Sequence, residues 1–270
     1  MDENNNPQDE IKQEETLEQT PQAVEVSDEE VTTFRWKVAS FLALSSIAVF
    51  VLFLLISPFF TYTSKPAIYL YPDKEQKVEV KLDKSIQYIN TIPNYHNGWV
   101  VMAKPNGIIY DLQPQYTDCK KLPYNEFGFE YSKKACEVNA YPYIFWDGIQ
   151  LLKPLPQKET GFIVEREQIE NFLNDSADLL KMTGNEKAEF ISFWAYKMKE
   201  KNYDKFKVYF LQNEEVDKYL PIKVSPKPKS SNRVQIVIDK ANDDEQIEEQ
   251  ILIPFSREGF TLVEWGGVIK

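Results

Sequence analysis

The longest apolar pattern in the chain runs from Val38 to Phe60, a stretch without a single charged side chain. Only Pro58, near its end, would disturb a helix. A helix needs about 20 apolar residues to cross the hydrocarbon core of a bilayer. The pattern therefore predicts a transmembrane helix whose partner is the lipid bilayer. The alternative, a buried helix of a soluble core, fits this length and lack of charge poorly.

C-terminal to this segment, short strand-like patterns dominate. Lys77–Leu82 alternates apolar and polar side chains, which is typical of a half-exposed strand. Trp99–Ala103 and Ile108–Leu112 flank a Pro-Asn-Gly turn, so we expect them to pair as a hairpin. The other β-like runs are Lys65–Pro72, Tyr141–Gly148, Lys205–Leu211, Pro221–Ser225, Arg233–Ile238, Ile247–Phe255 and Phe260–Trp265.

Helical spacing occurs only in the middle of this region. Glu165–Met182 places apolar side chains on one face, Gly184 can stop that helix, and Asn185 can cap a second helix that runs to about Lys201. Two helices joined by so short a link predict a helical hairpin. The fold class that follows is α+β, with a mostly antiparallel, sandwich-like β domain and the helices packed on one side.

Charge divides the chain unevenly. Residues 1–30 hold eleven acidic side chains and one basic one, a net charge of -10, whereas the whole chain carries -11. The remainder is nearly neutral, which argues against nucleic-acid binding. Residues 1–33 are polar and lack aromatic side chains, so we expect a disordered tail. The expected parts are this acidic tail, a transmembrane signal-anchor with a short linker (34–64) and an exported β-rich domain (65–270).

Basic residues beside the apolar segment predict its orientation. Arg35 and Lys37 abut it on the N-terminal side, and Lys65 lies close on the other side. The positive-inside rule then favours a cytoplasmic N-terminus and an extracytoplasmic C-terminal domain, although further lysines after Lys65 oppose this assignment. The apolar run is too long for a cleaved signal peptide. The predicted location is the cell membrane, with a single pass.

Two cysteines, Cys119 and Cys136, fall in the half expected to be exported. Oxidising compartments favour disulfides, and closing a loop of this size stabilises a fold by about 3 kcal/mol. Two free thiols or a metal site are the alternatives. With one histidine and no CxxC pair, a zinc site lacks ligands, and no metal or cofactor is predicted. The segment 113–140 is expected to be irregular, and a disulfide would restrain it.

Two motifs place a carboxylate beside an indole at the end of an aromatic strand. They are Trp146-Asp147 and Glu264-Trp265, and each is followed by glycine. Two carboxylates that face each other across an aromatic cleft are what glycoside hydrolysis requires. Three interpretations are open: a ligand cleft, a hydrolase active site, or a structural role. In the structural case both indoles are core residues and both carboxylates cap turns or bond backbone amides.

Other catalytic signatures are absent. The chain has no GxGxxG, Walker loop, HExxH or GxSxG motif. His96 is the only imidazole, so any serine or cysteine triad must use it. The acidic run Asp239–Glu249 departs from the calcium-loop pattern at Ala241, and we interpret it as a polar hairpin loop. An enzyme is therefore not the leading expectation.

Six segments, taken in order, carry a family resemblance. They are KPAIYLYPDKEQKVEVKL, GWVVMAKPNG, YPYIFWDG, GNEKAEFISFW, PIKVSPKP and GFTLVEWGG. Together they resemble an uncharacterised, mostly bacterial family of membrane-anchored exported proteins. The resemblance covers nearly all of 65–270 and implies export, but it carries over no activity and no functional residue.

These observations lead to one expected function and one alternative. We expect a single-pass membrane-anchored envelope protein whose exported domain binds or organises an envelope component, such as a glycan or a partner protein. The alternative is a carbohydrate-active hydrolase that uses Asp147 and Glu264 as paired carboxylates.

Overall fold

The computed structural model describes most of the chain in two compact units. The described residues are 28–56, 60–114, 119, 129–151 and 156–270. The first unit ends at Leu54 and the second begins at Leu55. Most of the predicted acidic tail, residues 1–27, lies outside the described residues. Residues 28–33, which were also assigned to that tail, are helical instead.

One long helix, α1, runs from Asp28 to Ile56, and all but its last two residues belong to the first unit. Its span from Thr32 to Leu52 is long and apolar enough to cross a membrane, and every side chain in that span is exposed. The predicted apolar helix is confirmed, but its last turn ends before Phe60, which belongs to a strand.

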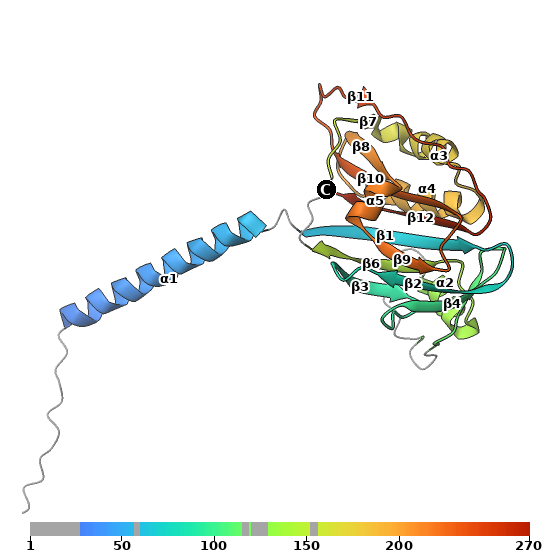
Figure 1. The fold of residues 1–270 in the computed structure, drawn as a ribbon. Coiled ribbons are helices and arrows are strands. Elements are labelled where there is room, and N and C mark those ends of the chain that lie inside the picture. Colours follow the sequence, from blue (N-terminus) through green and yellow to red (C-terminus); the bar gives the residue numbers. More distant parts are fainter. Residues whose placement is uncertain (1–27, 57–59, 115–118, 120–128, 152–155) are drawn as a thin grey trace, which may run out of the picture. The chain divides into compact units, whose positions relative to one another are not determined.

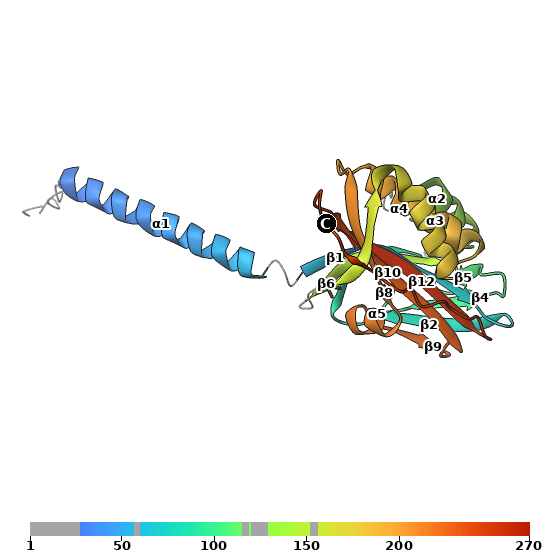
Figure 2. The same cartoon turned by 90° about the horizontal axis from the view of Figure 1, so that it is seen from above.

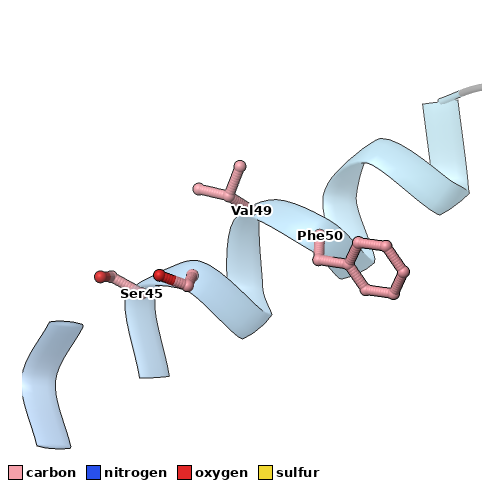
Figure 3. Close-up of a pocket in the computed structure, with 4 residues that line it drawn as sticks. Ser45, Val49 and Phe50 are labelled. Atoms are coloured by element: carbon pink, nitrogen blue, oxygen red, sulfur yellow. The ribbon is translucent and has the colours of Figure 1, made fainter. Parts of the chain in front are cut away.

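The serines of α1 are compatible with an apolar environment. The hydroxyls of Ser45 and Ser46 donate hydrogen bonds to the Leu42 carbonyl, at 2.9 and 2.8 Å. A hydroxyl bonded within its own helix presents no unsatisfied polar group to lipid. Figure 3 shows Ser45 with Val49 and Phe50 on successive turns, where they line an open depression of the helix surface.

An eight-stranded sheet forms the centre of the second unit (Figure 1). Its order is β11-β7-β8-β10-β12-β1-β6-β3, and neighbours are antiparallel except for the parallel pairs β10–β12 and β7–β11. The strands are β1 Phe60–Tyr71, β3 Ile86–Ile92, β6 Ile144–Leu151, β7 Thr160–Glu165, β8 Lys205–Gln212, β10 Ser230–Lys240, β11 Glu248–Glu249 and β12 Thr261–Ile269. β3 and β7 were not predicted from the sequence.

A four-stranded antiparallel sheet, ordered β5-β4-β2-β9, covers part of the larger one. Its strands are β2 Gln76–Leu82, β4 Trp99–Ala103, β5 Ile109–Asp111 and β9 Ile222–Ser225. β4 and β5 form the predicted hairpin, with Ala103 opposite Ile109. Gly107 has a φ of +85° in the connecting turn, a conformation that favours glycine.

The predicted helical hairpin is present as α3 (Ile169–Leu179) and α4 (Gly184–Lys199). A short 3₁₀ turn precedes α3, so this helix begins later than expected. The cap of α4 is Thr183 rather than Asn185: the Thr183 N–H donates to the Glu186 carboxylate at 3.2 Å. Two further helices, α2 (Phe129–Val138) and α5 (Glu214–Tyr219), were not predicted.

The large sheet has a separate apolar core on each face. Figure 2 shows α3 and α4 on one side of it and β2, β9 and α5 on the other. Along β1, Ala67 and Tyr69 enter the core beneath the helices (the helix-side core), whereas Ile68 and Leu70 enter the core beneath the small sheet (the sheet-side core). The α+β, mostly antiparallel class expected from the sequence is confirmed.

The domain begins earlier than residue 65. Thr61–Ser64, expected to be a linker, belong to β1. Thr61 lies opposite Gln150 and Thr63 opposite Gly148 in β6, and Ser64 lies opposite Gly267 in β12. The Thr63 side chain is fully buried. The pairing partner in β6 lies almost a hundred residues away in the sequence, so local patterning could not reveal it.

The run Ile247–Phe255, expected to be a strand, is a strand only at Glu248–Glu249, which form β11. Two glutamine side chains hold it to β8: Gln250 bonds both the N–H and the carbonyl of Phe210, and Gln212 bonds both those of Ile253. The acidic run before it is not a hairpin loop, because β10 and β11 are not neighbours; the chain crosses β8 to reach β7.

The two cysteines form the predicted disulfide, Cys119–Cys136. Both are buried, and Cys136 lies in α2, so the segment 113–140 is not wholly irregular as expected. The bond joins α2 to a part of the chain 17 residues earlier and sits in the sheet-side core.

Replacing both cysteines, Cys119→Ser and Cys136→Ser, should lower the free energy of unfolding by about 3 kcal/mol, because the unfolded chain regains the entropy of a 17-residue loop. Denaturant unfolding of the full-length protein in detergent micelles measures this. Reductant should destabilise the wild type and leave the double variant unchanged. Equal stability of the two proteins would contradict the prediction.

Candidate functional site

The first predicted motif, Trp146-Asp147, lies in β6 and serves the packing of the sheet. The Trp146 ring is fully buried in the sheet-side core. Asp147, 8% exposed, accepts hydrogen bonds from the backbone N–H and the side-chain amide of Asn90, at 2.8 and 3.0 Å. Asn90 follows a bulge at Ile89, where β3 has one residue more than β6. The carboxylate therefore holds β3 at an irregularity in its pairing.

The second predicted motif, Glu264-Trp265, lies in β12 and is fully buried. The Glu264 carboxylate pairs with the guanidinium of Arg233, which also binds Asp217 at 2.5 Å and the Leu220 carbonyl at 2.7 Å. Burial alone would lower the pKa of Arg233, but Glu264 and Asp217 raise it overall, so this guanidinium stays charged. The pair joins β10 and β12 to α5.

The structure places the two tryptophans of these motifs on opposite faces of the sheet. Trp146 belongs to the sheet-side core and Trp265 to the helix-side core. Because neighbouring side chains alternate along a strand, Asp147 and Glu264 also point to opposite faces. A catalytic carboxylate must reach its substrate, and Glu264 has no exposed surface. This geometry favours the structural interpretation of the four residues over a ligand cleft or a glycosidase pair.

A cluster of charged and aromatic residues that the sequence did not predict lies between β1 and α4. At its centre is Lys65, which sits in a bulge of β1 with a φ of +46° and is 4% exposed. Its Nζ lies 2.9 Å from Oε2 of Glu189 in α4. The same ammonium lies over the rings of Phe193 and Trp265, 4.9 and 5.4 Å from their centroids. Cation–π attraction and an ion pair thus act together on one buried cation.

The cluster extends along β1 towards its C-terminal end. Tyr69 packs against Tyr143 with the two rings tilted by 50° and 5.0 Å between their centroids. Tyr71 is hydrogen-bonded to the carboxylate of Glu186. Glu186 is fully buried and accepts two hydrogen bonds from Arg257, at 3.1 and 2.5 Å. The members of this Lys65 cluster are Lys65, Tyr69, Tyr71, Tyr143, Glu186, Glu189, Phe193, Arg257 and Trp265.

Burial governs the protonation of the cluster. It lowers the pKa of Lys65, although the Glu189 carboxylate opposes this. It raises the pKa of Tyr69 and of Tyr71, and the glutamates raise both further, so the two phenols stay protonated. The Tyr69 hydroxyl finds no hydrogen-bond partner among the described residues. The cluster therefore contains a neutral hydroxyl donor, that of Tyr69, and two ion pairs, Lys65–Glu189 and Arg257–Glu186. This arrangement suits a structural contact between β1 and α4 better than proton transfer.

Four of the six segments singled out in the sequence meet in this cluster. KPAIYLYP supplies Lys65 and both β1 tyrosines, and YPYIFWDG supplies Tyr143. GNEKAEFISFW supplies the two glutamates and Phe193, and GFTLVEWGG supplies Trp265. One signal could have indicated this: Glu186, Glu189 and Phe193 are spaced to share a face of α4, as are alternate residues of β1.

The remaining candidates gain no catalytic partners. Both cysteines are bonded to each other and cannot act as nucleophiles. Burial raises the pKa of Asp111, and the nearby His96 opposes this rise. The His96 Nε2 has no hydrogen-bond partner among the described residues. The described part of the chain contains no group of three or more His, Cys, Asp or Glu side chains that could hold a metal ion.

Comparisons with known proteins give no match: no profile of a protein family, no curated protein and no solved structure is similar to this chain.

Glu264→Gln should lower the free energy of unfolding by about 3 kcal/mol or more, because it leaves the buried Arg233 guanidinium without its closest counter-charge. Denaturant unfolding measures the loss. The double variant Arg233→Met, Glu264→Leu should lose less than the two single variants combined. A catalytic Glu264 would instead leave stability unchanged, so a fully stable Glu264→Gln protein contradicts the structural role.

Lys65→Met should alter how stability depends on pH. Since the folded-state pKa of Lys65 is depressed, the unfolded state binds more protons just below its pKa of 10.5, and wild-type stability should rise with pH through that window. The variant should lack this rise. Unfolding free energies measured between neutral pH and pH 10.5 test it, with the exposed Lys77→Met as control. Parallel curves for all three proteins would refute the assignment.

Proposed function

We propose that this chain is a single-pass, membrane-anchored envelope protein whose extracytoplasmic domain binds or organises an envelope component or a partner protein. α1 serves as the signal-anchor, with the N-terminus in the cytoplasm. The function is one of binding and organisation, and it needs no catalytic site.

The observation that carries this proposal is the exposed apolar surface of α1. From Val38 to Ile56 the helix has no charged side chain, and the described side chains of this stretch are uncovered. Exposure of so large an apolar surface to water is unfavourable, whereas the hydrocarbon core of a bilayer would cover it. Its serine hydroxyls are bonded within the helix, which suits the same environment.

Two features support the proposed orientation. Arg35 and Lys37 lie on the N-terminal side of the apolar stretch, where the positive-inside rule places the cytoplasm. The Cys119–Cys136 disulfide lies on the other side and is of the kind that persists in oxidising compartments. The resemblance to membrane-anchored exported proteins agrees with both.

A binding role is supported by how the domain uses its reactive groups. Glu264 forms an ion pair with Arg233, and Asp147 accepts hydrogen bonds from Asn90. The two cysteines are bonded to each other. The two sheets face each other across the sheet-side core, and we propose that this sandwich-like body acts as a rigid platform at the membrane. Envelope glycans and other envelope proteins are the partners that its location would offer.

The orientation can be tested with a phosphatase that is active only outside the cytoplasm. Fused after Lys270 it should be active, and fused before Met1 it should be inactive. Resistance of the full-length protein to alkaline extraction from membranes tests the anchor itself. The reverse pattern of reporter activity, or release by alkali, would overturn the proposal.

Sedimentation with isolated envelope glycan then separates a glycan partner from a protein partner.

A further inference from the structure

Three of the four sheet edges in the domain carry features that prevent pairing with another strand. β11 has two residues, and both are glutamates. β9 has four residues, including Lys223, and is followed directly by Pro226. β5 has three residues, and Ile109 is bridged to Tyr141 beside it. Short length, charge, proline and a covering segment are the usual protections of an exposed edge.

The fourth edge, β3, lacks most of these protections. It has seven residues, Ile86–Ile92, none of them charged, and like β9 it is followed directly by a proline, Pro93. Among the described strands it pairs only with β6. Gln87 is exposed, and Tyr88 and Ile89 are 45% and 53% exposed. Among the strand side chains whose burial the structure describes, these are the only large apolar ones exposed next to each other.

β3 is also firmly positioned. Asp147 binds Asn90 on one side of the bulge. On the other side Gly148 allows a close approach, since a Cβ there would lie 2.5 Å from the Gln87 carbonyl. Tyr88 packs on Tyr95, with 4.8 Å between ring centroids. Because this edge is already ordered, it loses little conformational entropy when another strand pairs with it.

We propose that β3 is a homodimer interface, in which it pairs antiparallel with β3 of a second copy of this chain, centred on Ile89. The two eight-stranded sheets would then continue across the contact. This interface extends the proposed function by naming one partner, but it does not depend on the orientation of α1.

The sequence of β3 favours a second copy over an unrelated segment. IQYINTI is nearly symmetric about its centre, so antiparallel self-pairing on Ile89 sets Ile86 opposite Ile92, Gln87 opposite Thr91 and Tyr88 opposite Asn90. Apolar residues meet apolar ones and polar groups meet polar ones or a phenol. No like charges meet, because the strand has none.

The bulge at Ile89 favours this register over its alternatives. A bulge bends its strand and increases the local twist. Only pairing centred on the bulge places the bends of both copies at the same point, so that the strands curve together. Any other register would set a bent segment against a straighter one.

The contact is closed. An isologous interface uses the same surface of both copies, so pairing through β3 stops at two and leaves no free β3 edge. If α1 anchors both copies in one membrane, as proposed above, their high effective concentration there strengthens a short contact of this kind.

Cysteine cross-linking tests the interface. The native cysteines are bonded to each other, so Ile89→Cys introduces the sole free thiol among the described residues. Directly opposed residues in an antiparallel pair have Cα atoms about 4.5–5.5 Å apart, within reach of a disulfide. In the full-length protein in its membrane, mild oxidation should give a covalent dimer. The control is Ile251→Cys, which removes the same residue type from a site 89% exposed.

We expect about tenfold more dimer from Ile89→Cys than from Ile251→Cys, because only the former position is held opposite its copy. The register has its own test: Tyr88→Cys and Asn90→Cys should cross-link when mixed and only weakly alone. Ile89→Lys places two like charges opposite each other in the proposed contact. In detergent, this variant should have a smaller dimer fraction than the wild type and the same melting temperature.

Three results would overturn the proposal. One is equal cross-linking of Ile89→Cys and Ile251→Cys, and another is a wild-type protein that is monomeric at all concentrations and unaffected by Ile89→Lys. The third is cross-linking of Ile89→Cys to a different protein, which would assign the edge to a foreign strand. Each can occur whether or not the reporter fusions support the proposed orientation, so the two proposals fail separately.

Discussion

The domain depends on a single strand that must satisfy two apolar cores at once. β1 runs through the large sheet between β12 and β6, and its successive side chains enter opposite cores. A strand buried on both faces cannot alternate apolar with polar residues, and KPAIYLY accordingly reads as one apolar run. The strand thus links the core beneath the helical hairpin to the core beneath the small sheet.

The bulge in β1 explains how a lysine comes to lie in the helix-side core. Between Ser64 and Ala67 the register shifts, and the left-handed backbone of Lys65 turns its side chain towards α4. The interior can hold this cation only because Glu189 neutralises it and aromatic rings face it. A strained backbone position and a buried charge thus coincide where the sheet meets its helices.

Much of the fold follows from the sequence, because the elements concerned are locally determined. The apolar α1, the β4–β5 hairpin with its Pro-Asn-Gly turn, the α3–α4 pair and the disulfide each depend on a short pattern. β3 was missed for a physical reason: an edge strand with a bulge and exposed side chains on both faces shows no period of two.

The candidate site could not be derived in the same way. Trp146-Asp147 and Glu264-Trp265 have similar local sequences, yet strand alternation sends their carboxylates to opposite faces. Arg233, the partner of Glu264, becomes its neighbour only through the parallel pairing of β10 with β12, which no local pattern encodes. Lys65 and Glu189 likewise meet across more than a hundred residues.

The position of β1 has a mechanical consequence. Three residues separate the end of α1 from Phe60, so tension carried along the chain from the apolar helix enters the domain at the start of β1. That strand is bonded to neighbours on both sides, and pulling it along its axis loads many ladder hydrogen bonds in shear rather than one after another. Attachment to an edge strand such as β3 would let the sheet unzip. A domain attached through an interior strand therefore resists a pull along that strand better than one attached through an edge.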